Sequence, residues 1–284
     1  MFEEEKEIHL HDLKKVRYAL SYVKNVMRYK DKRVVIPILE VWGSSQCNLR
    51  CKECMNRIPF ASPEKVPTDT IIHSIGRLSE MAKLNRIVIS GGEPLLNDEL
   101  HKIVLFLNLL PDVKKIYIIT NGTLMPDEKL LYVLSNADKA IKIVMNEYQG
   151  VTNRIGEIKE ELKQRKIAYV VRRLGDYQWK GIGNDICEPL HYETGRMIYA
   201  ECWMRKYAVL QGDTITKCPR GVVGRKHNIW IEHLRLSRLK NNAFSRAKLA
   251  VGLDSDIHKE YCRMCFGLSD ENPYTDVPGI QIKS

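Results

Sequence analysis

Apolar and polar positions alternate in a regular order between residues 34 and 171. Short runs rich in Val and Ile, typical of buried parallel strands, are separated by longer stretches with apolar residues at steps of three or four. The short runs predict strands at 34–41, 86–90, 115–120, 140–145 and 167–171. The longer stretches predict helices at 68–83, at 97–110, from Pro126 onward and at 152–166. This repetition predicts an α/β fold with a parallel sheet, either open or closed into a barrel.

The N-terminal 33 residues predict a helical extension. One apolar stripe recurs at steps of three or four residues, formed by Leu10, Leu13, Val16, Leu20, Val23 and Met27. Eight Lys or Arg and one Asp lie between Lys14 and Arg33. One interpretation is a helix that docks on the main domain and leaves a basic face in water. The alternative is that this face contacts an anionic substrate or a membrane surface.

The pattern changes again after about residue 185. Two β-prone runs flank Gln211-Gly212-Asp213 and predict a hairpin, and an Arg- and Lys-rich helix is expected at 232–250. We therefore divide the chain into a helical extension (1–33), an α/β domain (34–184) and a small C-terminal module (185–284).

Composition narrows the class of protein. The 284 residues are 44% hydrophobic and 28% charged, which is ordinary for a soluble globular protein. The longest apolar runs are far too short to span a bilayer, and the acidic N-terminus does not resemble a signal peptide. We therefore expect a cytoplasmic protein. Its eight cysteines are then better explained as metal ligands or catalytic groups than as disulfides.

Three of these cysteines, Cys47, Cys51 and Cys54, lie within eight residues directly after the first predicted strand. A closed structural zinc site takes four protein ligands, and an iron–sulfur cube also takes four. Three thiolates in one loop therefore leave one coordination position open, as expected of a site that performs chemistry. The alternative is a zinc site completed by a remote His or Cys.

A second group of four cysteines lies in the C-terminal module. Cys202 and Cys218 flank the predicted hairpin, and Cys262 and Cys265 form a CxxC pair. Together they can supply four thiolates to one metal centre. Their spacing does not separate zinc from an iron–sulfur cluster, but the neighbouring trio favours the cluster. Cys187 belongs to neither group.

Polar motifs follow the successive predicted strands. The cysteine trio follows the first strand, Gly91-Gly92-Glu93-Pro94 the second and Asn121-Gly122 the third. Because the carboxyl ends of parallel strands meet at one edge of a sheet or barrel, we expect these motifs to form one site.

These motifs resemble those of radical S-adenosylmethionine (radical SAM) enzymes. The Cys47-x3-Cys51-x2-Cys54 sequence is similar to the CxxxCxxC motif of that superfamily, and Gly91-Gly92-Glu93 to its GGE motif. The four-cysteine module is similar to the SPASM or twitch extension that binds an auxiliary 4Fe–4S cluster. The resemblance covers residues 34–284. It implies a partial (β/α)6 TIM-like barrel, SAM as cofactor and two 4Fe–4S clusters.

The resemblance also implies roles for individual residues. The iron left open by the trio would be chelated by SAM, whose reductive cleavage gives a 5′-deoxyadenosyl radical that abstracts a hydrogen atom from the substrate. An electron donor such as flavodoxin or ferredoxin would supply the electron. Contacts to SAM are expected from Gly91, Gly92, Glu93, Pro94, Asn121, Asn146 and Arg172. The position before the third cysteine is usually aromatic in this family and packs near the adenine, but it is Glu53 here, which has no ring for that contact.

The sequence specifies the substrate and the outcome of the reaction less closely than the cofactors. Cys187 is an ordinary buried residue, a spare cluster ligand or a hydrogen-atom donor. We expect dehydrogenation or epimerisation of a small molecule resembling a sugar, an aminocyclitol or a nucleotide sugar, because the 33-residue extension is shorter than a leader-binding domain. A net charge of +10 favours an anionic substrate. The alternatives are a ribosomally made peptide substrate, or a non-enzymatic zinc protein that binds nucleic acid.

Overall fold

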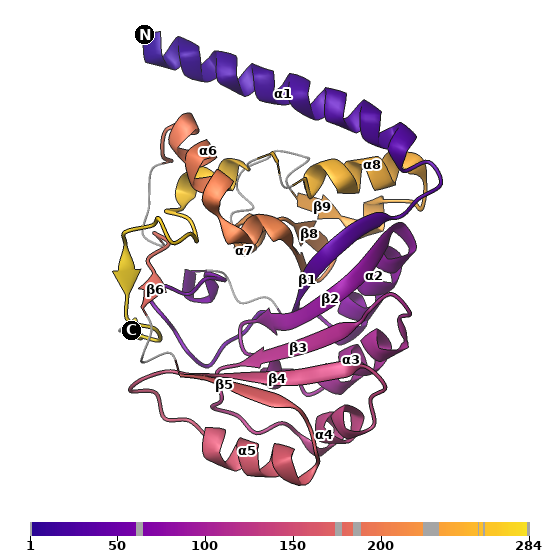
Figure 1. The fold of residues 1–284 in the computed structure, drawn as a ribbon, viewed down its shortest axis with the longest axis vertical. Helices are drawn as coiled ribbons and strands as arrows, with labels where there is room; N and C mark the ends of the chain where they lie inside the picture. Colours follow the sequence, from indigo (N-terminus) through magenta and orange to yellow (C-terminus); the bar gives the residue numbers. More distant parts are fainter. Residues whose placement is uncertain are drawn as a thin grey trace.

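The computed structural model describes residues 2–60, 65–173, 178–183, 189–223, 233–254, 256–257 and 259–282, with side chains from residue 15 onward (Figure 1). Among the helices in these segments, none is long and apolar enough to cross a membrane. Cys187 lies outside the described residues.

The centre of the molecule is an eight-stranded sheet in the order β5-β4-β3-β2-β1-β7-β8-β9. The first five strands are parallel, and β7 is parallel to β1 on the edge opposite β2. Their bounds are β1 Val34–Ser44, β2 Ala82–Gly91, β3 Lys115–Thr120, β4 Ala140–Glu147, β5 Tyr169–Arg173, β7 Tyr207–Gln211, β8 Thr214–Thr216 and β9 His233–Arg235. The predicted α/β class is confirmed, and all five predicted strands are present.

Four helices cover one face of this sheet. They are α2 Thr68–Met81, α3 Leu100–Leu109, α4 Glu128–Ser135 and α5 Ile155–Gln164. Their apolar faces pack with the strands into one core, in which Leu39, Ile87 and Ile75 are fully buried. Figure 1 shows α2, α3 and α4 along the outer side of the strands. The alternation of runs along the chain therefore builds a two-layer α/β arrangement.

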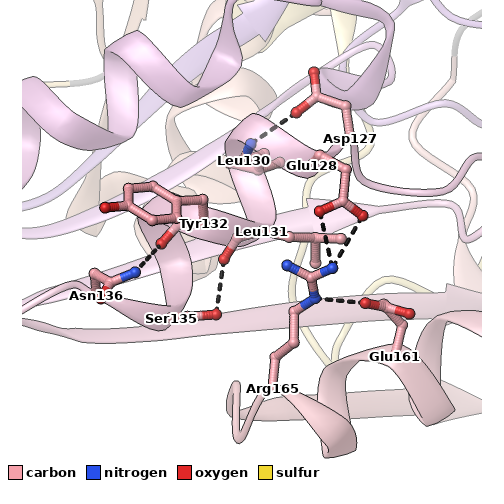
Figure 2. A network of polar contacts seen from close by, with 9 residues as sticks. All are labelled: Asp127, Glu128, Leu130, Leu131, Tyr132, Ser135, Asn136, Glu161 and Arg165. Carbon is pink, nitrogen blue, oxygen red and sulfur yellow. Dashed lines mark hydrogen bonds and ion pairs between the residues drawn. The ribbon is translucent and has the colours of Figure 1, made fainter.

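Helix α4 begins two residues later than expected, at Glu128 rather than Pro126. The Asp127 carboxylate is the reason, because it accepts a hydrogen bond from the Leu130 N–H (2.7 Å) and caps the helix (Figure 2). The same view shows Arg165, after α5, bonded to Glu128 of α4 and Glu161 of α5. The positive charge of Arg165 is therefore neutralised by carboxylates of the two outer helices.

The C-terminal module continues the barrel sheet. The predicted hairpin is confirmed as antiparallel β7 and β8. Its first strand supplies the sixth parallel strand, which pairs with β1 and not with β5. Pairing there satisfies N–H and C=O groups that a free edge of β1 would leave exposed.

Shorter elements complete the module. They are β6 Trp179–Lys180, α6 Tyr192–Glu201, η4 Trp203–Lys206, α7 Pro219–Val223, η5 Leu236–Arg238, α8 Ala243–Gly252, η6 Glu260–Met264 and β10 Thr275–Asp276. The helix expected at 232–250 is present as α8, but its predicted start is wrong, because β9 and η5 occupy residues 233–238 and α8 begins at Ala243. Asn242 sets this start, since its side chain accepts a hydrogen bond from the Ser245 N–H (2.9 Å).

The N-terminal helix α1 (Phe2–Arg28) docks on α8, as Figure 1 shows, but not through the predicted apolar stripe. Tyr18 is 5% exposed and packs with Val251 and Ile257. The Lys259 ammonium lies 5.4 Å from the centre of the Tyr18 ring. The described stripe residues are instead 56–76% exposed on the opposite face: Val16, Leu20, Val23 and Met27. The aromatic ring has more area to bury than these aliphatic side chains, and it also contacts a buried cation.

Candidate active site

The cysteine loop and the GGE motif are joined by backbone contacts. The Gly92 N–H donates to the Ser44 carbonyl and the Glu93 N–H to the Gln46 carbonyl, both at 2.8 Å. A Cβ atom on Gly92 would lie 2.0 Å from the Gln46 carbonyl oxygen. A Cβ atom on Gly91, whose φ is +108°, would lie 2.3 Å from the Ser44 oxygen. Both glycines are therefore required by the close approach of the cysteine loop to the end of β2.

Glu93 links the ends of β2 and β3. Its side chain is 1% exposed, and one carboxylate oxygen accepts from the Thr120 hydroxyl (2.8 Å) and the Leu95 N–H (3.1 Å). The other oxygen accepts from the Asn121 N–H (2.8 Å). Burial raises the pKa of Glu93, and these three donors partly offset that rise. A carboxylate has about four acceptor positions, so this group keeps one for a further donor.

Asn121 holds the first cysteine in place. Its Nδ2 lies 3.9 Å from Cys47 Sγ and donates to Asn48 Oδ1 (2.9 Å). Burial raises the pKa of the Cys47 thiol to about 12, and the charges of Glu93, Cys54 and Cys51 add to that rise. The trio, the GGE motif and Asn121 thus lie together, as their positions at successive strand ends predict.

The C-terminal segment contacts the middle cysteine of the trio. Gln281 forms a β-bridge with Cys51, and its Nε2 donates to Cys51 Sγ (3.4 Å). The Lys52 N–H donates to the Ile280 carbonyl, and the Lys52 ammonium pairs with Asp276 (3.0 Å). Sequence reasoning missed this contact because some 230 residues separate its two sides, and no local motif marks it.

Tyr148 lies against Gly279 of the same C-terminal segment, and Asn146 lies two residues before it at the end of β4. Asn146 Nδ2 donates to the Tyr148 hydroxyl (3.4 Å), whereas its buried Oδ1 accepts no hydrogen bond within the described part of the chain. Burial raises the pKa of Tyr148, and the charges of the three thiols raise it further. A buried amide oxygen that lacks a donor is costly, so this atom suits a bound hydroxyl or amino group. Arg172 is aligned with Asn146 across β4 and β5 and is exposed.

Glu53 has a local structural role. Its carboxylate accepts a hydrogen bond from the Ile182 N–H (2.9 Å) and so ties the cysteine loop to the segment after β6. An aromatic pair lies nearby on other elements, since the rings of Tyr148 and Trp179 meet edge to face at 5.4 Å. The pair was not expected from the sequence.

The four module cysteines also come together. Cys202 follows α6, Cys218 precedes α7, and Cys262 and Cys265 flank the end of η6. Burial is the main cause that raises the pKa of Cys218, and the charges of the other three thiols contribute. The Thr216 hydroxyl of β8 lies 3.3 Å from the Tyr261 hydroxyl of η6, so the end of the hairpin lies beside the turn that carries the CxxC pair.

The surroundings of these cysteines suit an anionic group. Arg220 is 4% exposed and donates to the Met264 and Ile182 carbonyls. Burial lowers the pKa of Arg57, and the charge of Arg220 lowers it further, while the charge of Cys265 partly offsets both. Two cations beside thiolate ligands are electrostatically favourable for an iron–sulfur cluster, whose net charge with four thiolates is negative.

Neither cysteine group is arranged around a single ion. Among the residues that the structure describes, no three His, Cys, Asp or Glu side chains form a group that could hold one metal ion. The ligands of an iron–sulfur cube bind different irons, so they stand further apart than the ligands of one zinc ion. The donor sets, three thiols and four thiols, fit two such cubes.

Comparison with known proteins identifies the class. Residues 43–182 match the radical SAM superfamily. The chain is 34% identical over 90 residues to GTP 3′,8-cyclase of Clostridium acetobutylicum (31% of this chain, 28% of that protein). It is 32% identical over 88 residues to molybdenum cofactor biosynthesis protein 1 of Dictyostelium discoideum (30% of this chain, 14% of that protein). The aligned segment thus spans less than a third of these curated relatives.

A solved structure of BtrN in complex with AdoMet and 2-DOIA has the same fold. The TM-score is 0.52 at 17% identity, over 86% of this chain and all of that one. The fold, the site and the family match together show that the chain belongs to the radical SAM superfamily and is a radical SAM enzyme. This family uses SAM and a 4Fe–4S cluster. The alternative of a non-enzymatic zinc protein is therefore set aside.

Proposed function

We propose that the chain cleaves SAM reductively and abstracts a hydrogen atom from a small anionic substrate. The observation that supports this most is the joined arrangement of Cys47, Cys51 and Cys54 with the GGE motif at the carboxyl ends of β1 and β2. A 4Fe–4S cluster held by these three thiolates would supply the electron that breaks the sulfonium bond, with flavodoxin or ferredoxin as the external donor.

In this proposal, residues at these strand ends contact different groups of SAM. The remaining acceptor position of Glu93 receives an N–H from the methionyl ammonium, a charge-assisted hydrogen bond. Asn146 Oδ1 accepts from a ribose hydroxyl. Arg172 pairs with the methionyl carboxylate. Tyr148 and Trp179 provide the aromatic surface for adenine that Glu53 does not.

The module holds the auxiliary cluster in this proposal. Cys202, Cys218, Cys262 and Cys265 are its ligands, and the nearby guanidinium groups of Arg57 and Arg220 stabilise its charge. The cluster either accepts an electron from the substrate radical, giving dehydrogenation, or shapes the pocket. Cys187 is retained as a hydrogen-atom donor that would give epimerisation. Unchanged turnover and product stereochemistry in Cys187→Ala would exclude that role.

In this proposal the substrate is a small molecule that resembles a sugar, an aminocyclitol or a nucleotide sugar and carries an anionic group such as a phosphate. The similarity to GTP 3′,8-cyclase favours a nucleotide within this class, because that relative is named for its action on GTP. A ribosomally made peptide is the second candidate. It predicts that an unmodified precursor peptide, and not a small molecule, accelerates SAM cleavage.

The test is anaerobic reconstitution followed by reduction with dithionite in the presence of SAM. We expect two 4Fe–4S clusters, hence about eight irons per chain, and formation of 5′-deoxyadenosine and methionine. Replacing all three trio cysteines by Ala should remove about four irons and all SAM cleavage. Replacing the module cysteines should remove four irons and leave uncoupled SAM cleavage. Colourless zinc-loaded protein, or iron-loaded protein that does not cleave SAM, would refute the proposal.

A further inference from the structure

One face of the parallel sheet is turned away from the helices, and strand register shows which residues it carries. Glu40 on β1 is aligned with Val88 on β2, and Val88 with Tyr117 on β3. Aligned residues of parallel strands point to the same side of the sheet, and neighbours along a strand point to opposite sides. The residues flanking Glu40, Leu39 and Val41, are in the core with the helices. The row that contains Glu40 therefore lies on the inner face of the barrel.

The inner face carries several cationic side chains from different strands. Lys142 on β4 is aligned with Tyr117, and Arg86 on β2 is aligned with Ile38, as is Tyr207 on β7. The Arg86 guanidinium lies 5.9 Å from the centre of the Tyr117 ring. Register and contacts therefore place Arg86 and Lys142 around the two phenols.

Arg86 and Tyr207 lie on either side of Ile38 across β1. Burial raises the pKa of Tyr207, the charge of Glu40 raises it further, and the charges of Arg86 and Arg172 lower it. Arg172 is aligned with Asn146 near the carboxyl ends of the strands, so it lies apart from the row of Lys142 and Tyr117. In the strand order, Arg86 on β2 lies between Tyr117 on β3 and Tyr207 on β7.

These charges are not neutralised within the described residues. Arg86, Lys142 and Arg172 take part in none of the ion pairs found there. The acid on the same face, Glu40, is 2% exposed, and one of its oxygens accepts hydrogen bonds from Trp42, Asn56 and Ser90. Arg165 on the outer surface contrasts with them, because two carboxylates hold it (Figure 2).

We propose that Arg86 and Lys142, with the hydroxyls of Tyr117 and Tyr207, form the binding site for a phosphate group of the substrate. This inference rests on the proposed function and specifies its substrate class. Guanidinium groups bind phosphate oxygens through paired hydrogen bonds, and phenols and ammonium groups add single donors. Unpaired cations on an inward surface have a positive potential that attracts such an anion.

The distance along the strands between these cations and the SAM site constrains the length of the substrate. Lys142 lies four residues before Asn146 on β4, about 13 Å along the strand, and Arg86 five residues before Gly91, about 16 Å. The carbon that loses hydrogen must lie near the strand ends, where SAM binds. The phosphate therefore lies on the order of 10–15 Å from the reacting carbon. An extended phosphate ester, such as a nucleotide or a phosphorylated sugar derivative, satisfies this separation.

The test measures binding of inorganic pyrophosphate to the reconstituted holoenzyme with SAM present, by anaerobic calorimetry without divalent cations. We expect Arg86→Gln and Lys142→Gln each to weaken binding about tenfold or more, since a hydrogen bond to a charged group contributes roughly 1.5–3 kcal/mol. Arg86→Lys should retain part of the affinity. The matched control is Arg154→Gln, which removes an outer cation paired with Glu157 and should change affinity less than about twofold.

Three results would overturn the inference. The first is equal affinity in Arg86→Gln, Lys142→Gln and the wild type, and the second is an equal loss in Arg154→Gln. The third is tighter binding of the tricarboxylate tricarballylate than of pyrophosphate, which would assign the site to carboxylates. Iron content and uncoupled 5′-deoxyadenosine formation are measured on the same samples. Absence of SAM cleavage in the wild type counts against the proposed function, whereas the pyrophosphate comparison still tests this site.

Discussion

Replacing Gly92 by Ala should separate the cysteine loop from the end of β2. The added Cβ would lie 2.0 Å from the Gln46 carbonyl oxygen, more than 1 Å closer than ordinary van der Waals contact. The contacting atoms are backbone, so no side chain can rotate away. The loop must move, and the two hydrogen bonds to Ser44 and Gln46 are then lost or lengthened.

The cost of this change can be bounded. Overpacking of this kind costs about 1–3 kcal/mol, and each lost hydrogen bond adds about 1 kcal/mol. The expected loss is about 3–5 kcal/mol, which at 2–4 °C per kcal/mol lowers the unfolding midpoint by roughly 10 °C. Because the loop carries Cys47, we also expect a loss of the iron that binds SAM, with the module cluster retained.

The assay combines thermal unfolding at a fixed scan rate, iron content, and the change in the EPR signal of the reduced protein on adding SAM. Gly156→Ala is the matched control, because this glycine lies in α5 and an added Cβ meets no atom within 4 Å. It should raise stability by about 0.5–1 kcal/mol. A Gly92→Ala protein with wild-type iron content, midpoint and SAM response would refute the packing argument.

Further variants test the interior and the helix ends. Glu40→Gln should preserve the three hydrogen bonds to one oxygen, whereas Glu40→Ala should cost at least about 2 kcal/mol by leaving buried donors unpaired. Burial raises the pKa of Glu40 in the folded state. The free energy of unfolding of the wild type should therefore fall as pH rises from the pKa of Glu40 in the unfolded chain to its higher pKa in the folded protein. Chemical denaturation of Glu40→Gln should show no such pH dependence from this site. Asp127→Ala should cost about 1 kcal/mol in the same assay, and an unchanged midpoint would mean that its cap is unimportant. Asn146→Ala should weaken SAM binding about tenfold at constant iron content, and equal affinity would rule out its ribose contact.

The two cysteine groups are both attached to the central sheet. The hairpin strand β7 that leads toward Cys218 pairs with β1, which leads into Cys47. Arg57, directly after the trio, reaches the electrostatic surroundings of Cys265. The two cysteine groups are therefore attached to neighbouring strands of one sheet.

Local patterns in the sequence were sufficient to predict much of the fold. Runs of Val and Ile marked all five barrel strands, and Gln211-Gly212-Asp213 marked the hairpin, because strand and turn preferences act over a few residues. The cysteine spacing and the GGE motif predicted one site, since parallel strand ends must meet at one edge.

Tertiary packing decided the rest. The stripe that includes Val16 and Leu20 predicted the wrong docking face for α1. The face that carries Tyr18 packs on α8 instead, because the Tyr18 ring buries more apolar area. The contact of Gln281 with Cys51 joins positions far apart in the chain, so no local pattern could reveal it. Likewise, Arg86 looks in sequence like any surface cation. Only strand register places it on the inner face of the sheet, beside the Tyr117 ring of the next strand.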